Sequence, residues 1–179
     1  PMLLAHIEDL VASTITDWNE YAVYEALIQA WLDREERRLR LQGRRDITGD
    51  SLYRACLLVA EHMQCSGSRF LSEAKLNELL HKHSEVDHLT QIKFGGRSLL
   101  NRNAQADYRF SHFSIQEYLV AQGLLQAAEA RDQLEVPTYA SEKVIRFVLD
   151  GRVKLCPQKP LVLRGLNLAR FDLKGANLE

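Results

Sequence analysis

Apolar residues recur at three- and four-residue steps through most of the first 150 positions, and this spacing predicts a mainly helical protein. A first helix is expected from Pro1 to Ala12, because proline is favoured in a first helical turn. A second helix, capped at Thr16 or Asp17 and ending near Gly43, gathers its apolar side chains on one face: Tyr21, Tyr24, Leu27, Ile28, Trp31 and Leu32.

Four later segments follow the same helical pattern. Asp50 or Ser51 is expected to cap a helix that runs to about Gln64, and Ser72 caps the next one. A short helical or irregular piece then leads to Gly95-Gly96. Ser114 is expected to cap a strongly apolar helix, and a last helix is expected over residues 141–149.

A hairpin is expected between these helices, with strands at Ser98 to Arg102 and Asp107 to Ser111 joined across Asn-Ala-Gln-Ala. Helix, helix, hairpin, helix is the layout of a winged-helix unit. From Leu161 the period changes to five, which fits neither a helix nor a strand, and one leucine occupies the centre of each unit: Leu163, Leu168, Leu173 and Leu178. This stretch resembles the pentapeptide repeat, so it is expected to form the first coil of a right-handed β-helix.

Composition and charge limit the function classes. The 179 residues are 46% apolar, and 23 Lys and Arg stand against 24 Asp and Glu, so the near-neutral chain has no global attraction to nucleic acid or to an anionic membrane. The three cysteines, Cys56, Cys65 and Cys156, have no paired spacing, which argues against a disulfide framework and a zinc site and favours a cytoplasmic protein. We find no membrane-length apolar run and no signal-peptide pattern. Both ends are expected to be cuts through a longer protein.

The segment Tyr-Arg-Phe-Ser-His-Phe-Ser-Ile-Gln-Glu-Tyr-Leu, from Tyr108 to Leu119, resembles the winged-helix segment of NACHT-type signalling ATPases. The matching residues are Phe110, His112, Ser114, Gln116, Glu117, Tyr118 and Ala121. Pro1-Met2-Leu3-Leu4 and Tyr21 to Glu35 resemble two segments of the small helical domain that precedes the winged helix in that family. The resemblance covers Pro1 to Leu125 in the family's order.

The resemblance implies four regions. Residues 1–45 would end the NACHT-associated helical domain, 46–130 would form the winged-helix domain, 131–160 a helical linker, and 161–179 the start of the pentapeptide-repeat β-helix. It further implies that His112 contacts the β-phosphate of ADP and that Pro1 lies against the adenine. ADP or ATP with Mg²⁺ would then be bound by the longer protein, together with its own nucleotide-binding domain, and the activated protein would form a homo-oligomer.

These 179 residues contain no Gly-x-x-x-x-Gly-Lys-Ser/Thr loop and no apolar strand that ends in paired acids. We therefore expect no ATPase activity from this chain alone. The predicted function is that of a regulatory segment, which holds an ADP-bound resting state and links the nucleotide-binding core to the repeats. Family-level analogy suggests antiphage defence. The alternative is a stand-alone winged-helix module that binds protein or DNA.

Each candidate residue also has a purely structural interpretation. His112 could be a packing or capping histidine at a strand-to-helix corner, and Pro1 could simply start a helix. Ser114 is expected to be an N-cap, and Gln116 and Glu117 to support the first turn of their own helix.

Three further groups are interpreted as surface features. The arginine cluster, interrupted by acids, is expected to be a solvated helix end: Arg34, Arg37, Arg38, Arg40, Arg44 and Arg45. The histidines of residues 81–88 lack the spacing of a metal site. The helix from Glu73 to His83 carries mixed charges, which disfavours DNA binding.

Overall fold

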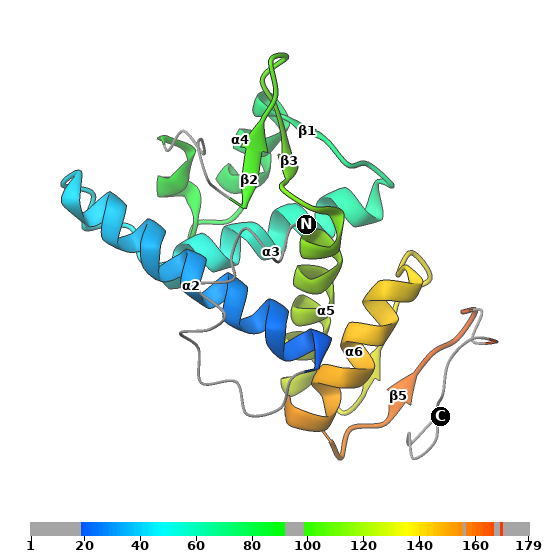
Figure 1. The fold of residues 1–179 in the computed structure, drawn as a ribbon. Coiled ribbons are helices and arrows are strands. Elements are labelled where there is room, and N and C mark those ends of the chain that lie inside the picture. Colours follow the sequence, from blue (N-terminus) through cyan, green and yellow to red (C-terminus); the bar gives the residue numbers. More distant parts are fainter. Residues whose placement is uncertain (1–18, 92–98, 156, 167–168, 170–179) are drawn as a thin grey trace.

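The computed structural model describes residues 19–91, 99–155, 157–166 and 169, and the elements below belong to that part of the chain. Five α-helices dominate it (Figure 1): α2 Glu20–Leu41, α3 Gly49–Cys65, α4 Glu73–His81, α5 Phe113–Glu129 and α6 Glu142–Leu155. The other elements are a 3-10 helix and five short strands: η2 Asp87–Gln91, β1 Leu71–Ser72, β2 Leu100–Arg102, β3 Asp107–Phe110, β4 Leu134–Glu135 and β5 Leu161–Val162. The prediction of a mainly helical protein is confirmed. None of the described helices is both long and apolar enough to cross a bilayer.

Local capping chemistry sets the starts of the helices. The side chain of Asn19 accepts a hydrogen bond from the amide of Ala22 at 2.8 Å, so α2 begins after Asn19 and the predicted cap at Thr16 or Asp17 is wrong. Thr48 caps α3, where Asp50 or Ser51 had been expected. The predicted cap of α4 at Ser72 is confirmed.

Helix α6 begins next to the predicted start but continues six residues beyond the predicted end, to Leu155. The hydroxyl of Ser141 accepts a hydrogen bond from the amide of Val144 at 3.2 Å and caps the first turn. Gly151 lies inside the helix and not at its end. A Cβ at this position would come within 2.4 Å of the ring of Tyr21, so the glycine marks a close helix contact.

Two small sheets flank the helices. The predicted hairpin is present as β2 and β3, with Leu100 opposite Phe110, and β1 pairs antiparallel with the other edge of β3 to give the order β1-β3-β2. The pattern did not predict β1 or β4, because a two-residue strand shows no alternation.

Helix α5 occupies the centre of the fold, packed against α3 on one side and α6 on another (Figure 1). Four buried rings join α2, α5 and α6: Tyr21, Tyr24, Tyr118 and Phe147, with centroids 5.1–5.7 Å apart in the closest pairs. Such aromatic contacts add to the burial of apolar area and fix the relative angles of the three helices.

The predicted β-helix is not shown. Strand β5 pairs in parallel with β4, and Gly165 follows in a turn with φ of 74°. The rest of the predicted repeats, apart from Ala169, lies outside the described residues. The predicted first helix, from Pro1 to Ala12, also lies outside them.

Candidate functional site at the start of helix α5

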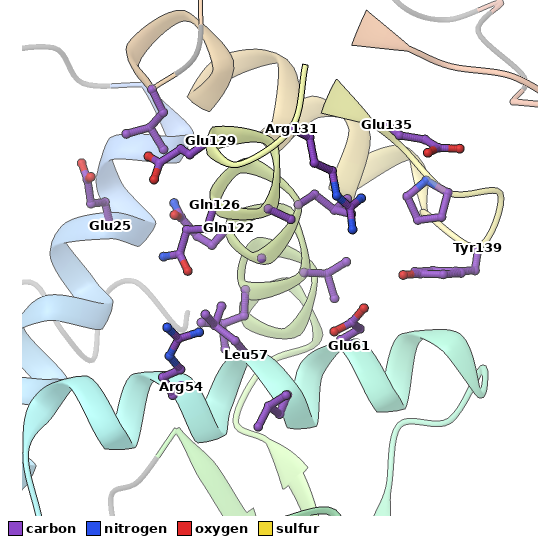
Figure 2. Close-up of a pocket in the computed structure, with 18 of the residues that line it drawn as sticks. Glu25, Arg54, Leu57, Glu61, Gln122, Gln126, Glu129, Arg131, Glu135 and Tyr139 are labelled. Atoms are coloured by element: carbon purple, nitrogen blue, oxygen red, sulfur yellow. The ribbon is translucent and has the colours of Figure 1, made fainter. Parts of the chain in front are cut away.

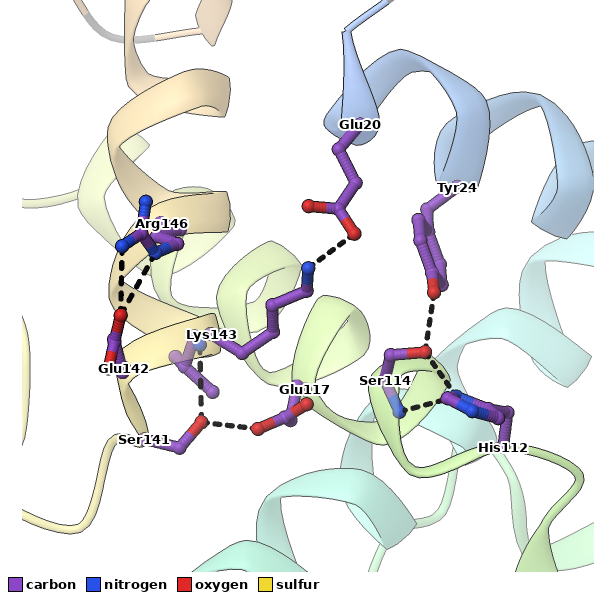
Figure 3. A network of polar contacts seen from close by, with 10 residues as sticks. Glu20, Tyr24, His112, Ser114, Glu117, Ser141, Glu142, Lys143 and Arg146 are labelled. Atoms are coloured by element: carbon purple, nitrogen blue, oxygen red, sulfur yellow. Dashed lines mark hydrogen bonds and ion pairs between the residues drawn. The ribbon is translucent and has the colours of Figure 1, made fainter. Parts of the chain in front are cut away.

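His112 lies at the corner between β3 and α5, where the sequence predicted a strand-to-helix junction. Its backbone is extended, with φ of −143° and ψ of 143°, and α5 begins at the next residue. The Nδ1 atom accepts a hydrogen bond from the backbone N–H of Ser114 at 3.2 Å, so His112 is itself the N-cap (Figure 3). The residue is exposed to solvent.

This hydrogen bond fixes the proton arrangement of the ring. A backbone N–H can only donate, so Nδ1 must accept, and the neutral ring then carries its proton on Nε2. No hydrogen bond joins Nε2 to a described residue. The corner can therefore present one imidazole N–H next to the N-terminus of α5, whose dipole is positive at that end, and both features favour an anion.

Ser114 is buried and does not cap the helix, so the prediction that it is the N-cap is wrong. Its Oγ lies 2.5 Å from Nδ1 of His112 and 2.5 Å from the hydroxyl of Tyr24 in α2. Burial raises the pKa of Tyr24, whereas the bond to Ser114 acts in the opposite direction. The Tyr24 hydroxyl therefore stays protonated and can donate to Ser114, which in turn can donate to His112.

Gln116 and Glu117 are also buried, and both contact other helices. Gln116 donates from Nε2 to Oε1 of Gln64 in α3 at 3.0 Å, and Gln64 donates to the carbonyl of Tyr139 at 3.2 Å. Glu117 accepts a hydrogen bond of 2.5 Å from the hydroxyl of Ser141, the residue that caps α6 (Figure 3). The prediction that Gln116 and Glu117 support their own helix is therefore wrong, because their side chains bind α3 and the start of α6.

Ion pairs on the surface hold α6 against α2. Lys143 contacts Glu20, and Lys154 lies 2.7 Å from Glu25. All four side chains are partly exposed, so each pair contributes little by itself. Together with the Tyr24–Ser114 and Glu117–Ser141 contacts, they place α2 and α6 on either side of the first turns of α5.

Substitution of Glu117 with glutamine should leave the protein at least as stable at neutral pH. Burial raises the pKa of this carboxyl above its ordinary value of 4.5, while the bond to Ser141 acts in the opposite direction. The folded state therefore binds the proton more tightly than the unfolded state, and the free energy of unfolding falls as pH rises from 4.5 through the folded pKa. Glutamine keeps an acceptor for the Ser141 hydroxyl, but it does not ionise, so the free energy of unfolding of the variant should not fall with pH for this reason.

Urea unfolding across this pH range measures the effect, and the advantage of Glu117→Gln should grow with pH. Ser141→Ala is the comparison: it removes the cap, which should cost about 1 kcal/mol, and its cost should grow with pH because the ionised Glu117 carboxylate also loses its hydrogen-bond donor. A variant that became progressively less stable than the wild type as pH rises would show that the ionised carboxylate stabilises the fold.

The arginine cluster at the end of α2 is largely paired with its own acids. Arg38 contacts Glu35 at 2.7 Å, Arg40 contacts Glu36, and Arg44 lies 3.2 Å from Asp46. These pairs agree with the interpretation of a solvated helix end. Arg37 is exposed and forms no ion pair with a described residue.

The histidines of residues 81–88 do not converge. His81 contacts Asp87, and His83 lies 3.9 Å from Glu85. Within the described ranges, no group of three or more His, Cys, Asp or Glu side chains is placed to hold a metal ion.

Helix α4 has little free positive charge. Lys75 and Lys82 both contact Glu78, at 2.9 and 2.7 Å. The hydrogen bonds from Lys82 and Lys75 lower the pKa of Glu78 to about 2, so it remains ionised and neutralises them across the physiological range. Phosphate contacts need free cations, which this helix does not offer.

The sequence identified His112 and its position but missed the residues that hold it. Tyr24 is 90 positions from Ser114, and Gln64 is 52 positions from Gln116. No local pattern marks such partners. Pro1, the second predicted nucleotide contact, lies outside the described residues.

Comparison with known protein families, with curated proteins and with solved structures found no match to this chain.

Proposed function

We propose that this chain is a regulatory and coupling segment of a NACHT-type signalling ATPase, in which His112 contacts the β-phosphate of ADP in the resting state. The exposed imidazole at the start of α5, with Nδ1 occupied by the Ser114 amide, is the observation that carries the proposal. The nucleotide-binding core would belong to the longer protein. The motif from Tyr108 to Leu119 supports assignment to the NACHT family. Analogy with other members of that family supports a role in defence against phage.

The strand order supports assignment of residues 46–130 to a winged-helix unit. Strand β1 precedes α4, the β2–β3 hairpin follows it, and β1 joins the hairpin through β3. Strand β3 of the hairpin ends at Phe110, two residues before His112. This arrangement would let a rigid hairpin and α5 present the imidazole together.

The contacts around α5 suggest how a change at the phosphate would reach other helices. His112 is joined through Ser114 to Tyr24 in α2, and one turn further along, Glu117 is joined to the cap of α6. Release of a phosphate from His112 would change the hydrogen bonds at the start of α5, and these hydrogen bonds connect α5 to α2 and α6. A nucleotide that binds one arrangement better than another shifts the population between them. The linker, residues 131–160, would carry that shift towards the repeats.

Replacement of His112 with alanine in the longer protein should weaken ADP binding roughly 10- to 100-fold, because a hydrogen bond to a charged group contributes about 1.5–3 kcal/mol. His112→Asn is the matched variant: asparagine is a good N-cap, so α5 should remain capped while the outward imidazole N–H is lost. Both variants should raise basal signalling. The measurement is the ADP dissociation constant by calorimetry, with thermal unfolding as the check on folding.

Two results would contradict the proposal. Unchanged ADP affinity in both variants would show that His112 does not contact the phosphate. A coding sequence without a phosphate-binding loop before Pro1 would show that the longer protein is not an ATPase of this family. The alternative of a DNA-binding module is not favoured by α4, whose lysines are both paired with Glu78.

A further inference from the structure

A groove of about 820 Å³ runs beside α5, between α3 and the segment that leads from α5 to α6 (Figure 2). Apolar side chains from all three parts line it, among them Leu57, Leu124 and Pro137. These three side chains are only partly buried, so the groove presents apolar surface to the solvent. An occupant that covers such surface gains about 25 cal/mol per Å².

The face of α5 that lines the groove carries small residues. Gly123 and Ala127 both lie on it, and their four-residue spacing places them on one side of the helix. Glycine inside a helix is unfavourable relative to alanine, and a Cβ at Gly123 would meet nothing within 4 Å, so no neighbour in the described fold requires this glycine. Two helices approach most closely where the side chains between them are small, so this face suits a second helix.

Gln122 places a hydrogen-bond acceptor beside these small residues. The side chain is 5% exposed and lines the groove, and its Nε2 donates to the hydroxyls of Tyr21 at 2.5 Å and Tyr118 at 2.7 Å. Its Oε1 accepts no hydrogen bond from a described residue. This oxygen keeps some contact with solvent, so a donor on an occupant can reach it. Ammonium and guanidinium groups are donors of this kind.

The charges that line the groove are mostly acidic. Five glutamates line it against two arginines, although the whole chain has nearly equal numbers of acids and bases. One of the five, Glu25, is already paired with Lys154 at 2.7 Å. Three others come from different sides of the groove, are exposed and form no ion pair with a described residue: Glu61 from α3, Glu129 from the end of α5 and Glu135 from β4 (Figure 2). A cationic occupant complements these charges, whereas an anionic one would be repelled.

We propose that this groove binds a basic amphipathic helix of another protein. The apolar face of that helix would pack on Gly123 and Ala127, and its lysines or arginines would lie beside Glu61 and Glu129, with one of them donating to Oε1 of Gln122. A helix that lays its apolar face into a groove is a recurring mode of peptide recognition. Binding at this groove requires neither a nucleotide nor His112.

Fluorescence anisotropy of a labelled peptide tests the proposal with the 179-residue chain. The probe is about 18 residues long, with leucines on one face of the helix and lysines on the other. A second peptide has the same residues in an order that gives no apolar face, and a third has glutamates in place of the lysines. The wild-type chain should bind the first peptide about tenfold more tightly than either of the others.

Three variants locate the contact on the surface of the chain. Gly123→Leu fills the space beside α5, and it should weaken binding more than about tenfold while the chain still melts cooperatively, because the position is open. Glu129→Lys should weaken binding about tenfold. Asp33→Lys is the matched control: it makes the same change in charge on α2, outside the groove, and should leave the affinity within about twofold.

Four results would overturn the proposal. The first is a folded wild-type chain that does not bind the lysine peptide. The second is equal binding of the reordered peptide, or an equal loss from Asp33→Lys and Glu129→Lys, since either would mean attraction by charge alone. The third is binding that Gly123→Leu leaves unchanged. The fourth is a chain that fills the groove with a second copy of itself, which sedimentation velocity would show as association that Gly123→Leu abolishes and the peptide does not displace.

Discussion

Substitution of Tyr118 with alanine is expected to lower the free energy of unfolding by about 3–5 kcal/mol, the range for loss of a large buried aromatic side chain. The ring is 2% exposed and lies 5.4 Å from the rings of Tyr21 and Phe147, measured between centroids. Its hydroxyl accepts a hydrogen bond of 2.7 Å from Gln122. The vacated volume would adjoin α2, α5 and α6 together, so no single side chain can fill it.

Thermal unfolding checks this result, and the melting temperature should fall by about 10 °C. Tyr118→Phe is the matched control. It keeps the ring, and Gln122 can still donate to Tyr21 at 2.5 Å, so the loss should be about 1 kcal/mol. An alanine variant no less stable than the phenylalanine variant would mean that the aromatic cluster does not hold the three helices together.

Gly151→Val is expected to destabilise the protein by about 3 kcal/mol, because additional carbon atoms in a packed core force neighbours away from their preferred positions. A Cβ at this position would lie 2.4 Å from Cε2 of Tyr21 and 2.6 Å from Cδ1 of Leu125. Tyr21 cannot swing aside at low cost, since its ring packs against Tyr118 and its hydroxyl is bound to Gln122. Helix α6 would have to move away from α2 and α5.

Gly123→Val provides the comparison within the same protein. Both glycines lie inside helices, but the position at Gly123 is open, so the same substitution there should leave the stability almost unchanged. Chemical unfolding of the two variants side by side gives the difference. Equal effects would show that helix propensity, and not the contact with Tyr21, decides the cost at position 151.

The sequence predicted the elements whose signals are local. The helical spacing from Tyr21 to Leu32 located α2, and the polar residues between two short apolar runs located the β2–β3 hairpin. Ser72 was recognised as a cap because a cap acts over only three residues. The corner at His112 was predicted for the same reason: a strand pattern ends and a helical one begins within a few positions.

The predictions failed where several local solutions were equally good. Asn19, Thr16 and Asp17 are all good caps, and the sequence alone did not rank them. At the start of α5, Ser114 is the better cap by residue type. Its hydroxyl instead contacts Tyr24, a residue of another helix, and His112 takes the capping position. The last helix was predicted to end at residue 149, whereas α6 continues through Gly151 to Leu155, and the sequence does not show the Tyr21 ring that requires this glycine.

The sequence by itself determined that the chain is mainly helical, which face of α2 is buried, and that His112 stands where a hairpin meets a helix. Only the tertiary structure decided that Ser114 binds Tyr24, that Glu117 binds Ser141, and that a groove remains beside Gly123. Hydrophobic spacing reports which side of an element is buried, because that choice repeats along the element itself. It does not report what the buried side meets, since that depends on the packing of segments far apart in the chain.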